Sequence, residues 1–270
     1  MCTATIYRTE GRFTLTMNRD ETSARAREVF PSLFGPWEPS GQWLAPADGE
    51  RGGTWIGVNA RGVTACILNA YAPGEDPRAK SKTSRGAIVP RLLERGDSRE
   101  VLTWIRGEFD PSPYASFHLV MLWLGGGAHW LWSGQTFTES PPLDDQWFLM
   151  TTSYWHAEAV EAWRRQAFQT WLSAGCEYEG YLPTFNIEQP PGKADWAPLM
   201  DRPWSYTRSI TQVVVDTGER RSIMRYWARR RCTAVNGEIP DCELALPLLA
   251  LRSGDAEKDK QADEGDVDRG

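Results

Sequence analysis

Short β-like runs joined by tight turns open this chain, and they limit its fold more than any other feature. Residues 3–7 and 12–17 flank the first turn, and apolar side chains alternate along the second run. Residues 54–58 and 63–69 flank a four-residue turn with Asn and Gly at its ends, and the last run is almost wholly apolar. Because hairpins join antiparallel neighbours, this pattern favours antiparallel sheets over alternating strand–helix units.

Helical periodicity appears in the middle of the chain. Residues 86–93 and 99–109 read as helices, the second preceded by the N-cap residue Asp97. The clearest helix is 156–172, whose apolar face contains Val160, Trp163, Ala167, Phe168 and Trp171. Further strands are expected at 115–124, 128–132, 147–151, 210–215 and 222–227. The Pro- and Gly-rich stretch 31–53 reads as a loop.

Composition narrows the class of protein. A net charge of −6 over 270 residues argues against a nucleic-acid-binding surface. No run approaches the roughly 20 apolar residues of a membrane helix, and the first residues lack the regions of a signal peptide, so we expect a cytoplasmic protein. We predict a single domain over residues 1–251, followed by a disordered acidic tail at 252–270.

The cysteine, histidine and tryptophan residues indicate which kinds of binding site the chain can form. The five cysteines include no CxxC pair and the three histidines form no cluster at metal-ligand spacing, so we expect no metal and no resident cofactor. Fourteen tryptophans indicate either a heavily aromatic core or an aromatic-lined cleft, and the sequence leaves both open.

Cys2 directly follows the initiator Met1. A small residue at this position favours removal of the methionine, which would leave Cys2 with both a thiol and a free α-amino group. Their ordinary pKa values, about 8.5 and about 7.7–8.0, allow the amine to accept the thiol proton near neutral pH. Nucleophile and base would then belong to one residue, although a second residue is often arbitrary.

Three further motifs follow in order along the chain. They are Asn18-Arg19-Asp20-Glu21 where the second run meets a loop, Gly-Gly-Thr-Trp-Ile-Gly-Val-Asn at 52–59, and Ser84-Arg85-Gly86 before a helix. Together with Met1-Cys2-Thr3, this ordered set resembles the NRDE-motif family, also called the transport and Golgi organisation protein 2 family. The resemblance implies the α+β fold of N-terminal-nucleophile hydrolases, a four-layered αββα sandwich with two stacked, mainly antiparallel sheets.

The resemblance extends to cysteine amidases that cleave penicillin V and conjugated bile acids, and it implies a site. Cys2 would be the nucleophile, with Arg19 and Asp20 orienting it, Asn69 binding the oxyanion through its side-chain amide, and Arg208 lining the site from a late strand. The thiolate would attack a carbonyl while the α-amine takes and returns the proton. Candidate substrate-binding residues are Asn18, Trp55, Arg85 and Thr152.

Thr152 departs from the amidase pattern, which has an asparagine at that position. A hydroxyl donates one hydrogen bond over a shorter reach than an amide. Two functions therefore stay open: a cysteine-type amidohydrolase acting on a non-peptide C–N bond of a small metabolite, and a non-catalytic haem, lipid or acyl-CoA binding and trafficking protein. Haem iron would need an axial ligand, but His118, His129 and His156 each read as ordinary structural residues. In both cases the expected partner is a small molecule.

Overall fold

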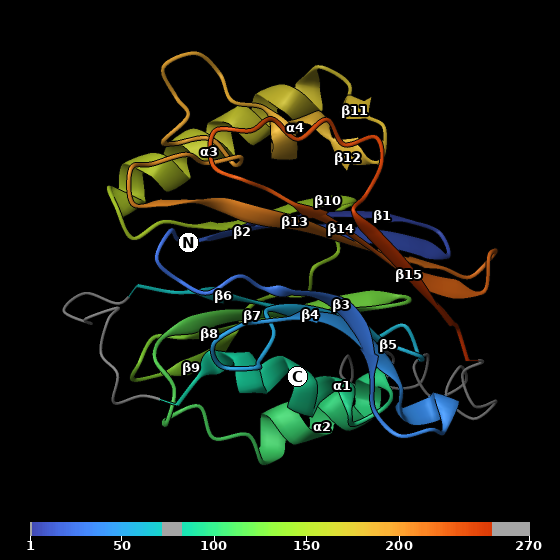
Figure 1. The fold of residues 1–270 in the computed structure, drawn as a ribbon. Coiled ribbons are helices and arrows are strands. Elements are labelled where there is room, and N and C mark those ends of the chain that lie inside the picture. Colours follow the sequence, from blue (N-terminus) through green and yellow to red (C-terminus); the bar gives the residue numbers. More distant parts are fainter. Residues whose placement is uncertain (1, 72–82, 250–270) are drawn as a thin grey trace, which may run out of the picture.

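Two antiparallel sheets are stacked face to face between two layers of helices (Figure 1). The structure, a computed structural model, describes residues 2–71 and 83–249. The first sheet has the strand order β10-β1-β2-β13-β14-β15. Its strands are β1 (Cys2–Thr9), β2 (Arg12–Thr22), β10 (Trp147–Thr152), β13 (Ser205–Asp216), β14 (Arg221–Ala228) and β15 (Cys242–Pro247).

The second sheet has seven strands in the order β3-β4-β5-β6-β7-β8-β9. They are β3 (Val29–Phe34), β4 (Trp43–Ala47), β5 (Ile56–Asn59), β6 (Thr64–Asn69), β7 (Phe117–Trp123), β8 (Gly126–Trp132) and β9 (Phe137–Glu139). A small two-stranded ladder of β11 (Tyr178–Glu179) and β12 (Leu182–Pro183) lies apart from both sheets.

The helices cover the outer faces of the two sheets (Figure 1). Helices α3 (Ala157–Ser173) and α4 (Thr184–Ile187) lie over the six-stranded sheet, and α1 (Ile88–Leu93) and α2 (Ser98–Gly107) lie over the seven-stranded one. The αββα order predicted through the family resemblance is confirmed. In the two described stretches, the helices are too short or too polar for any of them to cross a bilayer.

The stretch 31–53, expected to be a loop, instead contains most of β3 and all of β4, so that prediction was wrong. Prolines in both strands suggested a loop, but β3 is an edge strand and its ladder with β4 shifts register between Val29 and Ser32. An edge position and an irregular ladder both tolerate the missing proline N–H groups. The predicted acidic tail at 252–270 lies outside the described residues.

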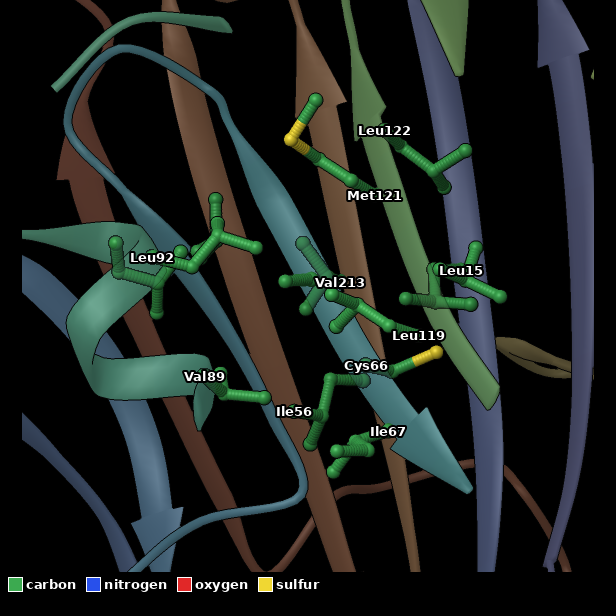
Figure 2. Close-up of a cluster of buried hydrophobic side chains, with 14 of the residues drawn as sticks. Leu15, Ile56, Cys66, Ile67, Val89, Leu92, Leu119, Met121, Leu122 and Val213 are labelled. Atoms are coloured by element: carbon green, nitrogen blue, oxygen red, sulfur yellow. The ribbon is translucent and has the colours of Figure 1, made fainter. Parts of the chain in front are cut away.

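The main hydrophobic core fills the space between the sheets and continues under α1. Alternation along each strand sends every second side chain into this layer. Figure 2 shows part of the core, with side chains from both sheets and from α1: Leu15, Val213, Cys66, Leu122, Val89 and Leu92. Smaller aromatic clusters, including Phe168, Trp171 and Phe185, fix α3 and α4 to the other face of the six-stranded sheet.

Two glycines hold the segment before β5 against the start of α1. Thr54 N–H donates to Gly86 O at 3.0 Å. A Cβ on Gly53 would lie 2.7–2.8 Å from the backbone of Gly86, closer than side-chain carbons approach other atoms. The close backbone approach that the glycine-rich motif predicts therefore occurs between Gly53 and Gly86.

This contact gives a test of the fold. We expect Gly53→Ala to lower the free energy of unfolding by about 1–3 kcal/mol, because the backbone of Gly86 cannot yield as a flexible side chain would. The matched control is Gly107→Ala at the end of α2, where a Cβ meets nothing within 4 Å. That change is expected to be neutral or slightly stabilising in denaturant unfolding; equal losses in both variants would contradict the close-packing account.

Candidate active site

Cys2 begins β1, a strand with neighbours on both sides. In the ladder it lies opposite Arg19 of β2 and Thr152 of β10, so the three side chains share one face of the sheet. That face points toward the second sheet, where Cys2 joins the main core with only 8% of its surface exposed. Cys66 of β6 lies near enough for the two thiols to affect each other's titration.

Burial dominates the electrostatics of the Cys2 thiol. It raises the pKa of the Cys2 thiol, and the Asp20 charge acts in the same direction. Two groups among the described residues lower the thiol pKa, but by less than burial raises it. They are the backbone N–H of Asp20, which donates to the sulfur, and the guanidinium of Arg19. The geometry therefore supplies groups that stabilise a thiolate, while burial holds the resting thiol in its protonated form.

The side chain of Asp20 lies on the opposite face of the sheet, under α3. Thr207 Oγ1 donates to its Oδ1 at 2.6 Å, and the Nη2 of Arg164 lies 3.8 Å from its Oδ2. That Oδ2 is buried without a hydrogen-bond partner among the described residues. Burial raises the pKa of the Asp20 carboxyl, and Arg164 opposes the rise. Asp20 thus contacts the thiol through its backbone, not through its carboxyl group.

Arg164 is the residue of this region that sequence reasoning missed. It is fully buried, and its guanidinium donates to Thr3 Oγ1 and Thr151 Oγ1 at 3.0 and 3.1 Å. It also donates to the carbonyls of Trp196 and Ala197 at 2.7 and 2.9 Å. The signal was its spacing, four residues after Val160 and four before Phe168 on the apolar face of α3.

Arg19 and Arg208 take part in a buried ionic network on the inner side of the sheet. Arg19 pairs with Asp48 at 2.8 Å and Glu28 at 3.4 Å, and its guanidinium lies 4.2 Å from the centre of the Trp55 ring. Arg208 reaches the same Glu28 at 3.3 Å. A register shift between Thr207 and Ser209 marks Arg208 as a bulge residue, a local irregularity that redirects a side chain.

The predicted site residues Asn18, Arg85 and Asn69 bond to other partners than the Cys2 row and its ionic network. Asn18 lies on the outer face, where Asn18 and Asn186 exchange hydrogen bonds of 2.8 and 2.9 Å. Arg85 Nη1 donates to Ser116 O at 2.7 Å. Asn69, at the end of β6, donates from Nδ2 to Tyr71 Oη at 3.4 Å. The structure therefore brings together Cys2, Arg19, Trp55, Thr152 and Arg208 on the inner face, and Asn18 and the Asp20 carboxyl on the outer one.

A cavity of about 550 Å³ adjoins this inner face. Its lining is drawn from the ends of β6, β7, β8 and β10 and from α3: Ala70, Tyr71, Ser116, His118, Leu131, Ser133, Gln135, Thr152, Ser153, Ala157 and Glu161. Thr152 links it to Cys2, because the two residues are direct ladder partners. The Thr152 Oγ1 is buried without a hydrogen-bond partner among the described residues, so a ligand is the missing partner that the cavity can supply.

Two histidines form a hydrogen-bonded pair behind this cavity. His118 Nδ1 lies 2.9 Å from His129 Nε2, and His129 Nδ1 lies 2.8 Å from Ser140 Oγ. Burial lowers the pKa of each imidazole to about 4. Both rings are therefore neutral at neutral pH. Within the described parts of the chain, no three His, Cys, Asp or Glu side chains are grouped to hold a metal ion.

We expect Arg164→Met to lower the free energy of unfolding by about 3–5 kcal/mol, because it leaves the buried Asp20 charge and two carbonyls without their partner. Arg165→Met is the control, since the neighbouring side chain is 59% exposed and its loss is expected to change stability by less than about 0.5 kcal/mol. Denaturant unfolding of both variants measures the difference. Similar values for the two would show that Arg164 does not hold the strands in place.

The histidine pair predicts an acid sensitivity. The unfolded chain binds protons near the ordinary histidine pKa of 6.5, whereas the folded pair does so only near 4. Stability should therefore fall as the pH is lowered through this window, by up to about 1.4 kcal/mol per pH unit for each histidine. The double variant His118→Gln/His129→Gln should show a shallower pH dependence of its unfolding free energy. Parallel curves for variant and wild type would contradict the pKa shift.

Two solved structures are similar to this chain. An N-acylethanolamine-hydrolyzing acid amidase ortholog from Caenorhabditis elegans is similar at a TM-score of 0.56 and 12% identity, over 78% of this chain and 91% of that chain. A conjugated bile acid hydrolase from Clostridium perfringens has a TM-score of 0.49 and 10% identity, over 92% of both chains. The first likeness shows that the chain has the N-terminal-nucleophile hydrolase fold. No curated protein matches the chain.

The family comparison completes the assignment. The model of the Transport and Golgi organisation 2 family matches residues 1–175 of the 270. This stretch contains Cys2, the tetrad that begins at Asn18, the glycine-rich strand segment and Thr152. The chain belongs to the Transport and Golgi organisation 2 family, as the order of its motifs predicts.

Proposed function

We propose that this protein is a cysteine-type amidohydrolase that cleaves a non-peptide C–N bond of a small metabolite, with Cys2 as its nucleophile. The observation that carries the proposal is the row Arg19–Cys2–Thr152. It places a cation, a thiol and a hydroxyl without a partner among the described residues side by side, and the hydroxyl-bearing residue lines a cavity. A protein of the same fold is named for hydrolysing N-acylethanolamines, which are amides.

The nucleophile requires removal of Met1. The free α-amine of Cys2 then takes the thiol proton, and the thiolate attacks the amide carbonyl carbon. The tetrahedral intermediate collapses when the same proton passes to the leaving nitrogen, which gives a thioester and an amine. Water, deprotonated by the α-amine, attacks the thioester, and the thiol leaves with the acid as product. The chain supplies every group that moves a proton in this scheme.

Asp20 supports the amine in this scheme. Its Oδ2 has no hydrogen-bond partner among the described residues, and its backbone N–H already contacts the Cys2 sulfur. An ammonium group at the start of β1 would provide the missing donor and a compensating charge for a buried carboxylate. Asp20 is thus a positioning residue, and Arg164 and Thr207 hold it from the other side.

The oxyanion needs donors beside the thiol. Thr152 Oγ1 is the first, because it is a buried hydroxyl directly across the ladder from Cys2. Asn69 is the second, through its backbone instead of its side chain. Ile67 N–H donates to the Trp55 carbonyl at 2.9 Å. Because N–H groups two residues apart in a strand point the same way, the N–H of Asn69 points in this direction too, beyond the start of β5.

Binding without turnover is the second candidate function. The specific observation that favours it is the burial of Cys2, which raises the pKa of the thiol and works against a nucleophile. In that case the cavity holds a small-molecule ligand, in agreement with a family named for transport, and Cys2 is only a core residue. Haem binding in this cavity is disfavoured, because His118 and His129 are hydrogen-bonded to each other and not arranged as separate axial ligands.

Brief iodoacetamide treatment at neutral pH, followed by intact-mass measurement and peptide mapping, tests the proposed nucleophile. We expect Met1 to be absent and Cys2 to be labelled faster than the exposed Cys232, although Cys2 is buried. Cys232 is the internal reference for an unactivated, accessible thiol, and Cys66 is the reference for a buried one. Retained Met1, or a Cys2 rate no higher than that of Cys232, would favour the binding protein.

A further inference from the structure

We propose that the cavity beside Cys2 binds an uncharged, hydroxyl-bearing group of the ligand, and that His118 is the residue that recognises it. The inference rests on the proposed function only in taking the ligand to be a substrate of Cys2. It names the substrate class: amides whose cavity-binding end carries a hydroxyl instead of a carboxylate, a sulfonate or a long alkyl chain.

The lining of the cavity is the first argument. Most of its described side chains carry hydroxyl, amide, imidazole or carboxyl groups, and three of them are aliphatic: Ala70, Leu131 and Ala157. Thr152 is 3% exposed, and its Oγ1, the oxyanion donor proposed above, has no hydrogen-bond partner among the described residues. Several of these groups already have protein partners, as Ser133 has in Thr136 and Ser153 in Trp155, so an alkyl chain in this space would leave chiefly His118 without a hydrogen bond.

The histidine chain is the second argument. Because His118 Nδ1 is bonded to His129, its Nε2 is the ring nitrogen left for a ligand. The hydrogen bonds that connect Ser140, His129 and His118 can be oriented in either direction, depending on the tautomers of the two rings. In one direction His118 Nε2 carries a hydrogen and donates, and in the other it accepts. A hydroxyl group both donates and accepts, so it suits either arrangement, whereas a carboxylate only accepts and an alkyl group does neither.

Charge is the third argument. Among the described lining residues Glu161 is the one Asp, Glu, Lys or Arg, and its carboxylate accepts hydrogen bonds from Ser153 N–H at 3.1 Å and Arg165 Nη2 at 3.2 Å. The imidazoles are neutral, as their lowered pKa values require. The described lining of the cavity therefore offers an anionic ligand no cation, and the nearby Arg165 guanidinium is already paired with Glu161.

Three hexanoyl amides that differ only at one end test the inference. They are N-(2-hydroxyethyl)hexanamide, N-propylhexanamide, in which a methyl replaces the hydroxyl, and hexanoylglycine, which ends in a carboxylate. Calorimetric titration of the Cys2→Ala protein separates binding from turnover. We expect the hydroxyl ligand to bind about fivefold or more tightly than each of the other two, the gain of about one net hydrogen bond.

Variants locate the source of this preference. His118→Phe should abolish it, and Ser140→Ala, a change at the far end of the chain, should weaken it. Ser140 is half-buried, so its loss is tolerated even where His118→Phe does not fold. The matched control is His156→Asn, an exposed histidine at a φ of 46°, a conformation that asparagine accepts, and it should keep the full preference.

The outcomes separate this inference from the proposed function. Equal or tighter binding of the propyl or glycine amide overturns the inference, as does an unchanged preference in both His118→Phe and Ser140→Ala. Turnover of the same three amides by the wild-type protein is then measured. Preferential binding of the hydroxyl ligand without turnover would contradict the amidohydrolase activity and support the hydroxyl-binding site. Turnover without this preference would support the activity and contradict the site.

Discussion

A buried guanidinium on the helix side of the six-stranded sheet ties together the strand that begins with Cys2 and its two neighbours. Arg164 hydrogen-bonds Thr3 of β1 and Thr151 of β10 and approaches Asp20 of β2, so one side chain holds three strand ends in register. Cys2 begins the first of these strands, between its ladder partners Arg19 and Thr152, so its position depends on this register. Removing one partner of a buried charge pair leaves the other uncompensated, which makes this arrangement stable only as a whole.

The two faces of the six-stranded sheet have different roles. On the outer face Asn18, Asp20 and Thr207 bond to neighbouring elements, while on the inner face the thiol lies beside Thr152, which lines the cavity. On the inner side the cations are already neutralised. The guanidinium groups of Arg19, Arg25 and Arg208 lie among the carboxylates of Glu21, Glu28, Asp48 and Glu50. These arginines brace the site, and in our proposal the ligand is recognised by His118 instead.

Local patterns predicted much of this and missed what depends on distant contacts. The hairpins, α3 and the ordered motifs were readable because period and turn chemistry are local. Strands β3 and β4 were not, since their prolines are tolerated only because of where the strands lie in the sheet. The tetrad did not end β2 but lies inside it, up to Thr22. Alternation then sends Asn18 and Arg19 to opposite faces, which no motif reveals, and Arg164 was hidden within an apolar helix face.

Trapping of an acyl-enzyme tests the central claim most directly. The purified protein is mixed with a hexanoyl p-nitrophenyl ester, quenched in acid, and measured by intact mass and peptide mapping beside the Cys2→Ser protein. The account predicts one hexanoyl group per chain, as a thioester on a peptide that begins at Cys2, with release of the acid over time in unquenched samples. A hexanoyl group on Cys232 or a lysine, or none at all, would contradict Cys2 as the nucleophile.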